Sequence, residues 1–265
     1  TDWHLIHWGQ MLLSGAGMFT IEATAVSAEG RITPGCVGLY DDATESALAT
    51  TLARARRQAP PMPVAIQLAH AGRKGSSSRP WEGGLLVSPE RGGWTPVAPS
   101  AVPHAEGESA PMALDAAGLA ALRAAFVASA KRAERCGIDA IELHMAHGYL
   151  LHEFLSPLSN NRTDEYGGSL DNRMRLPLAV AKAVRGVWPP GKPLFVRKTR
   201  ALLLTAAGGR LQQAVQQALT SIDHSVDEIR GAGNARRVTL STYASFASLW
   251  LVPRLALFQR QHPQI

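Results

Sequence analysis

Short apolar runs alternate with amphipathic segments along most of this chain, and that alternation limits the folds it can adopt. Four runs rich in β-branched and aliphatic residues are expected to be buried strands, at 18–26, 63–68, 138–143 and 194–197. Four segments have the composition and capping residues of helices, at 4–16, 43–58, 116–136 (after Asp115 as N-cap) and 171–187. Strands separated by helices favour parallel pairing through crossovers. The sequence therefore predicts an α/β fold, either a (β/α) barrel or an open doubly wound sheet.

Charge and proline content both change near residue 198. Residues 1–197 carry 19 Lys and Arg against 18 Asp and Glu, whereas residues 198–265 carry 8 against 3, so most of the net charge of +6 lies in the C-terminal part. Of the 17 prolines, 15 precede Arg197. We therefore predict two domains, at 1–197 and 198–265.

Length and composition argue against several classes of protein. With 265 residues, 46% of them hydrophobic, the chain can bury a sizeable core. No apolar stretch reaches the roughly 18 residues of a membrane span, and the first residues lack the pattern of a secretory signal. Cys36 and Cys136 offer neither a disulfide framework nor the paired spacing of a metal site. The sequence favours a cytoplasmic protein with no membrane partner.

The segment at 75–112 is rich in Gly, Pro and Ser and is too long for an ordinary connection. Loops of this length usually form lids or binding elements. Its residue Trp81 is expected either to cap a substrate pocket or to anchor the loop by packing.

Polar side chains gather where the run 138–143 ends. His144, His147 and Tyr149 follow it directly, and the alternation of side chains along a strand that then bends allows both imidazoles to converge on one bound atom. Imidazole N–H groups can stabilise an oxygen that gains negative charge, and a phenol can supply a proton. The residues alone equally allow a zinc half-site or polar groups satisfied within the loop.

Two further polar residues, Gln67 and Arg197, also stand at the C-terminal ends of predicted strands. A (β/α) barrel carries its active site at that end of its strands. We therefore expect Gln67, His144 and Arg197 to border one site.

Residues 2–197 resemble the Old Yellow Enzyme family of flavin-dependent ene-reductases, in its thermophilic-like branch. The stretches that carry this resemblance are HLIHWG, IEATAVSAEGRI, AIQLAHAGRK, RPWEGG, APSAVP, IELHMAHGYLLHEFLSPLSNNRTDEYGGSLDNRMR and PLFVR. The resemblance implies a TIM barrel that holds FMN at its C-terminal face. The flavin would take hydride from NADPH or NADH and deliver it to the C=C bond of an α,β-unsaturated carbonyl compound, a small enone.

By matching position, the resemblance also implies roles for individual residues. Ala23 would contact the flavin, Gln67 would hydrogen-bond the pyrimidine edge of the isoalloxazine, and Arg197 would lie near its N1 side, where a cation stabilises the reduced flavin. His144, His147 and Tyr149 would form the catalytic set.

In that set, His144 and His147 would hold the carbonyl oxygen of the substrate, and Tyr149 would donate a proton to its α-carbon. The histidines then need no metal ion.

The resemblance covers only part of a barrel. It predicts an incomplete (β/α)8 barrel, with strands equivalent to 2–5, followed by an unrelated and mostly helical C-terminal segment. From about Leu204 the sequence resembles the linker helix and the start of the effector domain of a LysR-type transcriptional regulator. The expected elements there are a helix at 204–229, a strand at 236–242 and a helix at 246–261. The chain is therefore expected to be a chimera.

Two other functions remain open beside the ene-reductase. Nothing after Arg197 resembles the loops that grip the FMN phosphate in the family, so the chain could be an inactive or weakly flavin-binding chimeric fragment. The basic C-terminal part instead suits a regulator-like protein that binds DNA or a partner protein, although the recognition helix is missing and nucleic acid is not the expected partner. An apolar seam at 211–229 would suit a homodimer.

Overall fold

The computed structural model describes residues 1–189, 195–198 and 201–204. The chain divides into two units, Thr1–Pro189 and Pro190–Ile265. The first unit contains three of the four predicted strands and all four helices predicted before residue 197.

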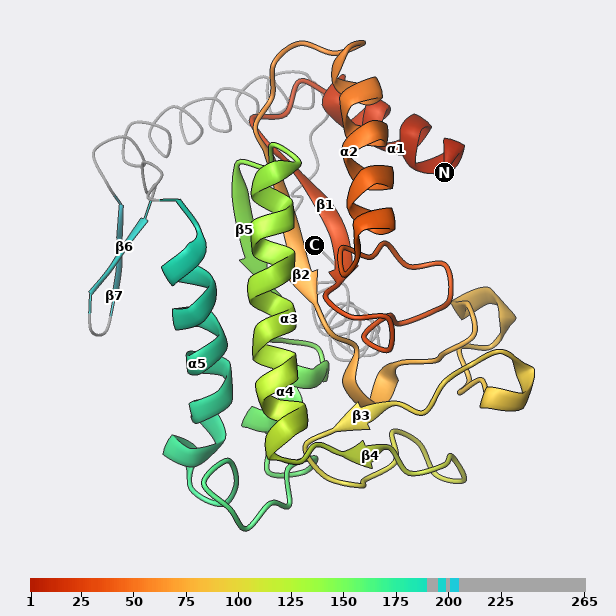
Figure 1. Cartoon of the computed structure of the whole chain (residues 1–265), viewed down its shortest axis with the longest axis vertical. Helices are drawn as coiled ribbons and strands as arrows, with labels where there is room; N and C mark the ends of the chain where they lie inside the picture. The colour runs from red at the N-terminus through yellow and green to blue at the C-terminus, as the bar shows by residue number, and fades with distance from the viewer. Residues whose placement is uncertain (190–194, 199–200, 205–265) are drawn as a thin grey trace, which may run out of the picture. The chain divides into compact units, whose positions relative to one another are not determined.

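Three strands form a parallel sheet at the centre of the first unit (Figure 1). They are β1 (Phe19–Ala25), β2 (Val64–Ala69) and β5 (Ala140–Leu143), in the order β1-β2-β5. Helix α2 (Asp42–Arg56) connects β1 to β2, and α3 (Ala116–Arg135) connects β2 to β5. The chain therefore contains two consecutive β-α-β units, as the alternation in the sequence predicts.

Three more helices complete this unit. Helix α1 (Asp2–Leu12) precedes the sheet, and its Trp8 donates a hydrogen bond from Nε1 to Glu22 on β1 at 3.1 Å. Helices α4 (Leu150–Leu155) and α5 (Leu170–Val187) follow β5. Helix α4 is not among the predicted helices, because six residues are too few to show a helical period.

Helices α2, α3 and α5 begin close to the predicted positions, because a short polar side chain caps the N-terminus of each. Asp41, Asp115 and Ser169 each accept a hydrogen bond from the backbone N–H three residues later, at 2.7, 2.8 and 3.3 Å. Such caps satisfy amide groups that have no partner inside the helix. Helix α1 ends earlier than expected, shortly before Gly15, whose φ of +77° is left-handed and does not continue a helix.

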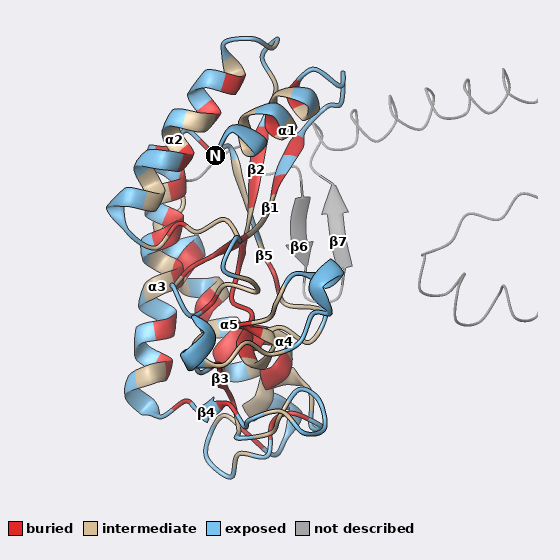
Figure 2. Cartoon of the chain, turned by 90° about the vertical axis from the view of Figure 1, so that its right-hand side faces the viewer, coloured by how far each residue is buried: buried red, intermediate tan, exposed pale blue. Residues whose placement is uncertain are grey.

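One face of β2 forms part of the apolar core. Val64, Ile66 and Leu68 are 0% exposed and belong to the same core as Leu52 of α2 and Phe126 of α3. Figure 2 shows α2 and α3 together on one side of the sheet. The alternate residues of β2 point to the other face, which is where the predicted flavin contact Gln67 lies.

The fourth predicted strand does not join the parallel sheet, which corrects the prediction for 194–197. Strand β6 (Phe195–Lys198) pairs antiparallel with β7 (Ala201–Leu204) in a separate two-stranded sheet. The two runs are only two residues apart in the sequence, so they can pair with little loss of chain entropy. Leu204 therefore ends a strand instead of beginning a helix. The other elements predicted within 205–265, and with them the seam for a homodimer, lie outside the described residues.

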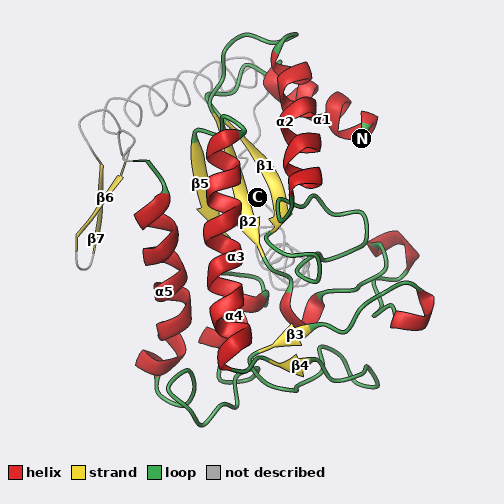
Figure 3. Cartoon of the chain, in the orientation of Figure 1, coloured by secondary structure: helices red, strands yellow, loops and turns green. Residues whose placement is uncertain are grey.

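The segment at 75–112 is mostly irregular, as predicted (Figure 3). Its regular parts are the 3-10 turns η2 (Pro80–Glu82) and η3 (Pro89–Arg91), and strand β3 (Val97–Ala98), which pairs with β4 (Met112–Ala113). Trp81 is 80% exposed and is therefore not a packing anchor. No described helix is both long enough and apolar enough to cross a membrane.

Candidate active site

The site begins where β5 ends. The backbone N–H of His144 donates to the carbonyl of Leu68 at 2.9 Å, so the pairing with β2 continues one residue beyond the strand. This pairing fixes the direction of the His144 side chain, which is 6% exposed. The strand thus delivers one imidazole to the carboxyl edge of the sheet, as predicted.

The chain then reverses direction through two left-handed residues. His147 has a φ of +58° and Gly148 a φ of +72°. A left-handed conformation costs a residue with a side chain about 1 to 2 kcal/mol, so it persists only where neighbours hold it. Two contacts do so: Lys74 Nζ donates to the His147 carbonyl at 2.7 Å, and the Gly148 N–H donates to His152 Nδ1 at 3.1 Å.

This reversal brings the three predicted catalytic side chains together. The ring centroids of His144 and His147 are 5.1 Å apart with an interplanar angle of 73°, and those of His144 and Tyr149 are 4.9 Å apart at 65°. Tyr149 is the N-cap residue of α4. The ring of His144 is therefore close to both the other imidazole and the phenol. Among the described residues, no group of three or more His, Cys, Asp or Glu side chains could hold a metal ion.

Burial favours the neutral forms of two of these groups. Desolvation, followed by the charge of His147, lowers the pKa of His144, which favours a neutral imidazole. Desolvation, followed by the charge of Cys36, raises the pKa of Tyr149, which keeps the phenol protonated. At neutral pH the cluster therefore offers an imidazole N–H and a phenolic O–H as hydrogen-bond donors.

The predicted flavin contacts lie on the neighbouring strands. Gln67 of β2 is paired in register with Glu142 of β5, and its Nε2 donates to Glu142 Oε1 at 3.0 Å. Ala23 lies in the irregularity of the β1–β2 pairing between Ile21 and Thr24. These residues suit a flat ring with a polar edge, because a carboxamide both donates and accepts hydrogen bonds and alanine leaves room beside it.

The side chain of Arg197, the third predicted flavin contact, is not among those described. Its residue lies in β6, which is not a strand of the parallel sheet. Its role near the flavin stays a prediction.

Lys74, which holds the left-handed turn, is missing from the predicted site residues. It ends the 3-10 turn η1 (Gly72–Lys74), which follows β2. The sequence does hold a signal for it, because the carboxyl ends of adjacent parallel strands meet at one edge of a sheet. A cation shortly after β2 is therefore close to residues that follow β5.

Glu153 of α4 is a second group missing from the prediction. It is 1% exposed, its Oε1 accepts a hydrogen bond from the Arg73 N–H at 2.9 Å, and its Oε2 has no partner among the described residues. Burial raises the pKa of Glu153 to about 8, although the N–H group and charge of Arg73 act in the opposite direction. The carboxyl is therefore mostly protonated at neutral pH and ties η1 to α4.

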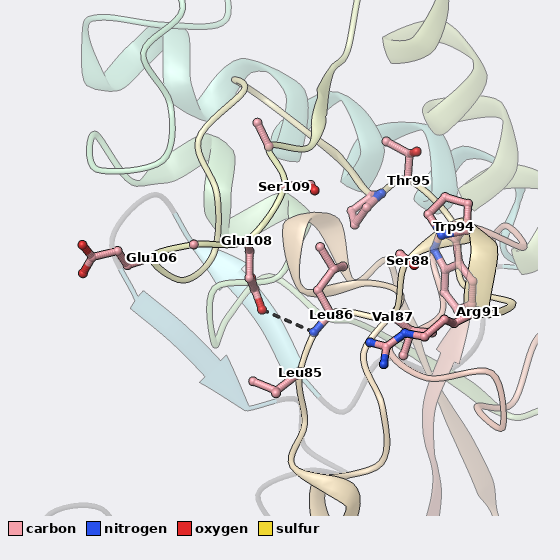
Figure 4. Close-up of a pocket in the computed structure, with 14 residues that line it drawn as sticks. Leu85, Leu86, Val87, Ser88, Arg91, Trp94, Thr95, Glu106, Glu108 and Ser109 are labelled. Atoms are coloured by element: carbon pink, nitrogen blue, oxygen red, sulfur yellow. Dashed lines mark hydrogen bonds between the residues drawn. The ribbon is translucent and has the colours of Figure 1, made fainter.

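A separate cavity of about 460 Å³ lies within the long segment (Figure 4). Residues from 85–96 and 106–110 line it, and the Leu86 N–H donates to Glu108 Oε1 across it at 3.3 Å. None of the six predicted site residues lines this cavity. The cavity is therefore distinct from the group of predicted site residues at the edge of the sheet.

The sequence is similar to that of a known protein family. The sequence profile of the NADH:flavin oxidoreductase / NADH oxidase family matches residues 2–199. The chain belongs to this family. Among the family's curated proteins, an NADH:flavin oxidoreductase of Gibberella zeae is 47% identical over 203 residues, which are 74% of this chain and 48% of that protein.

Other relatives agree with this assignment. An NADPH dehydrogenase of Clostridium acetobutylicum is 41% identical over 196 residues, 74% of this chain and 53% of its own length. The chain thus spans about half the length of these curated relatives. An NADPH dehydrogenase of Bacillus licheniformis is 39% identical over 228 residues, 84% of this chain and 62% of that protein, so this alignment extends beyond residue 197.

The fold is similar to that of several solved structures. Morphinone reductase matches with a TM-score of 0.59 and 32% identity over 71% of this chain and 51% of that chain. Old Yellow Enzyme from Pichia sp. AKU4542 matches with a TM-score of 0.60 and 27% identity over 71% of this chain and 48% of that chain. The α/β fold therefore resembles that of Old Yellow Enzyme structures, which supports the family resemblance seen in the sequence.

Proposed function

We propose that this chain forms part of an FMN-dependent ene-reductase, which transfers hydride from NADPH or NADH through the flavin to the C=C bond of an α,β-unsaturated carbonyl compound. The observation that carries the proposal is the convergence of His144, His147 and Tyr149 at the carboxyl edge of the parallel sheet. Family membership supports the redox chemistry, and the ring geometry supports the kind of substrate.

The two imidazoles bind the carbonyl oxygen of the substrate in this proposal. Their rings are 5.1 Å apart, close enough for both to donate to a single oxygen. Donors fixed before the reaction stabilise the negative charge that gathers on that oxygen, and losing one such donor typically costs about 3 kcal/mol of transition-state stabilisation. A neutral His144 does this through its N–H group.

Tyr149 supplies the proton. Its ring lies 4.9 Å from that of His144, and burial keeps its phenol protonated. A proton donor beside the bound carbonyl can protonate the α-carbon, which completes the reduction of the double bond.

FMN, when bound, supplies the hydride transfer between the nicotinamide and the substrate. Gln67 would hold the pyrimidine edge of the ring through its carboxamide, and Ala23 would leave space beside it. Arg197 would add a positive charge near N1.

The test measures flavin binding and enone reduction on the full chain. FMN is added to the purified protein, and the flavin-to-protein ratio is determined after free flavin is removed. Reduction of a cyclic enone is then followed with NADPH and with NADH. We expect a ratio near one and turnover, with kcat/KM falling about a hundredfold in His144→Ala and in His147→Ala.

The same variants should keep their flavin and should bind phenols more weakly. His7→Ala is the matched control, because His7 stacks on Trp3 of α1 and is absent from the proposed site. A chain that retains no flavin after FMN is added would contradict the proposal and favour an inactive fragment. Full turnover in both site variants would contradict the role of the imidazoles.

A further inference from the structure

Lys74 makes contacts at the proposed site that none of the predicted roles explains. Its Nζ donates a hydrogen bond to the carbonyl of His147 at 2.7 Å and lies 5.5 Å from the centre of the Tyr149 ring. One ammonium group thus contacts two of the three proposed catalytic residues. No ion pair joins it to a carboxylate within the described part of the chain.

The backbone of Lys74 is held firmly. Its N–H donates to Ala71 at 3.3 Å, and its carbonyl accepts a hydrogen bond from Ser77 Oγ at 2.9 Å. The preceding residue Arg73 donates its N–H to the buried carboxyl of Glu153 on α4. The turn η1 is therefore tied to α4, the helix whose N-cap residue is Tyr149.

The fit between η1 and α4 requires glycine. Gly72 has a φ of +63°, and a Cβ at this position would overlap the Glu153 carboxyl. A Cβ at Gly148 would lie 3.1 Å from Lys74 Nζ and 3.2 Å from its Cε, tighter than ordinary contact. The lysine side chain thus reaches the catalytic turn through a space that glycine at 148 keeps open.

We propose that Lys74 is a positioning residue of this site, whose ammonium fixes the carbonyl of His147 and stands against the ring of Tyr149, so that both side chains face His144. The inference rests on the proposed function, because it assigns Lys74 to the same site. The left-handed conformation of His147 needs an external partner, and Lys74 supplies a charge-assisted hydrogen bond to its carbonyl.

A positive charge beside a phenol also has an effect that can be measured without any cofactor. It favours the phenolate, so removing the charge should raise the pKa of Tyr149. The ionisation of Tyr149 can be followed by ultraviolet difference absorbance, with Tyr149→Phe identifying its part of the signal. If Lys74 merely stabilised the loop, its loss would expose Tyr149 and lower the pKa of the phenol, because burial raises that pKa.

The experiment compares Lys74→Met, Lys74→Gln and Lys74→Arg with the wild-type chain. In the first two we expect the midpoint of the Tyr149 titration to rise by up to about half a pH unit, from loss of a charge at this range. The rise stays below that for a permanent charge, since a lysine ammonium ordinarily titrates near about 10.4, in the same range as a phenol. Lys74→Arg keeps the charge and should restore most of the wild-type value. Lys131→Met removes an exposed charge of α3 and should leave the titration unchanged.

Histidine ring signals in NMR spectra give a second readout. Losing the donor at Lys74 should shift the ring resonances of His147, and arginine should largely restore them. Circular dichroism identifies the variants that fold, and Lys74→Gln serves if the methionine variant does not. An unmoved Tyr149 midpoint in the folded neutral variants, or an equal rise in Lys131→Met, would overturn the proposal.

The outcome is separable from that of the proposed function. Flavin retention and enone reduction by the wild-type chain test the reaction. The Tyr149 titration tests the position of Lys74 with neither flavin nor enone present.

Discussion

The two faces of β2 differ in composition, although the same six residues form both. Val64, Ile66 and Leu68 are completely buried on the face that belongs to the apolar core. On the other face, Gln67 is only half-buried and hydrogen-bonds to Glu142 of the next strand. One face of this strand therefore stabilises the fold, while the other presents polar groups toward the proposed flavin site.

The largest expected effect breaks the stabilising face. Ile66→Ala removes a fully buried side chain and should lower the free energy of unfolding by about 4 kcal/mol, since the lost burial adds to the cost of a cavity. Gln67→Ala on the other face should change it by less than about 1 kcal/mol. Denaturant titration of both variants measures the difference, and equal losses would show that the two faces are energetically alike.

A smaller effect concerns the buried carboxyl that ties η1 to α4. The pKa of Glu153 is raised to about 8 from its ordinary value of 4.5, so the folded state keeps a proton that the unfolded state loses between these values. Its contribution therefore falls as pH rises from about 4.5 to 8 and is constant above. Glu153→Gln keeps an acceptor without the charge, and should be about 3 kcal/mol more stable than the wild type at pH 8.

Urea titrations of both proteins at pH 5 and pH 8 test this expectation. The two proteins should have similar stability at pH 5, where the wild-type carboxyl is largely protonated in the folded state. A stability difference that does not change with pH would contradict the assignment of a protonated Glu153.

The smallest effect concerns His144. Burial lowers the pKa of His144, so on acidification the unfolded state takes up a proton near the ordinary value of 6.5 before the folded state does. The wild-type chain should therefore lose stability as pH falls below about 6.5, by less than the Glu153 effect. His144→Asn should remove this part of the slope, and thermal unfolding at pH 7.5 and 5.5 measures it. An equal slope in both proteins would mean that His144 is not desolvated.

Much of the fold could be predicted because local signals agree with it. β1, β2 and β5 begin and end within two residues of the predicted strands, and Asp41 and Asp115 cap helices where polar residues precede a helical segment. The prediction that the fourth strand joins the parallel sheet was wrong for a related reason. An apolar run shows that a strand forms but does not show which partner it takes, and β6 pairs with the run beside it.

The candidate site was predictable only in part. The spacing of His144, His147 and Tyr149 indicated that their side chains could meet. Lys74 and Glu153 were missed. The position of Lys74 shortly after β2 is a signal only once the pairing of β2 with β5 is known, because the lysine is about 70 residues from His147 along the chain, and Glu153 lies on a helix too short to show a period.

The α/β alternation, the family and the candidate site residues could be inferred from the sequence alone, because apolar periodicity, capping and motif spacing are all local properties of the chain. The left-handed conformation of His147, the ammonium that donates to its carbonyl and the buried Glu153 are visible only in the folded structure. Those features depend on how closely β2, β5 and α4 approach one another. A local sequence pattern does not predict the packing distance between segments that are far apart in the chain.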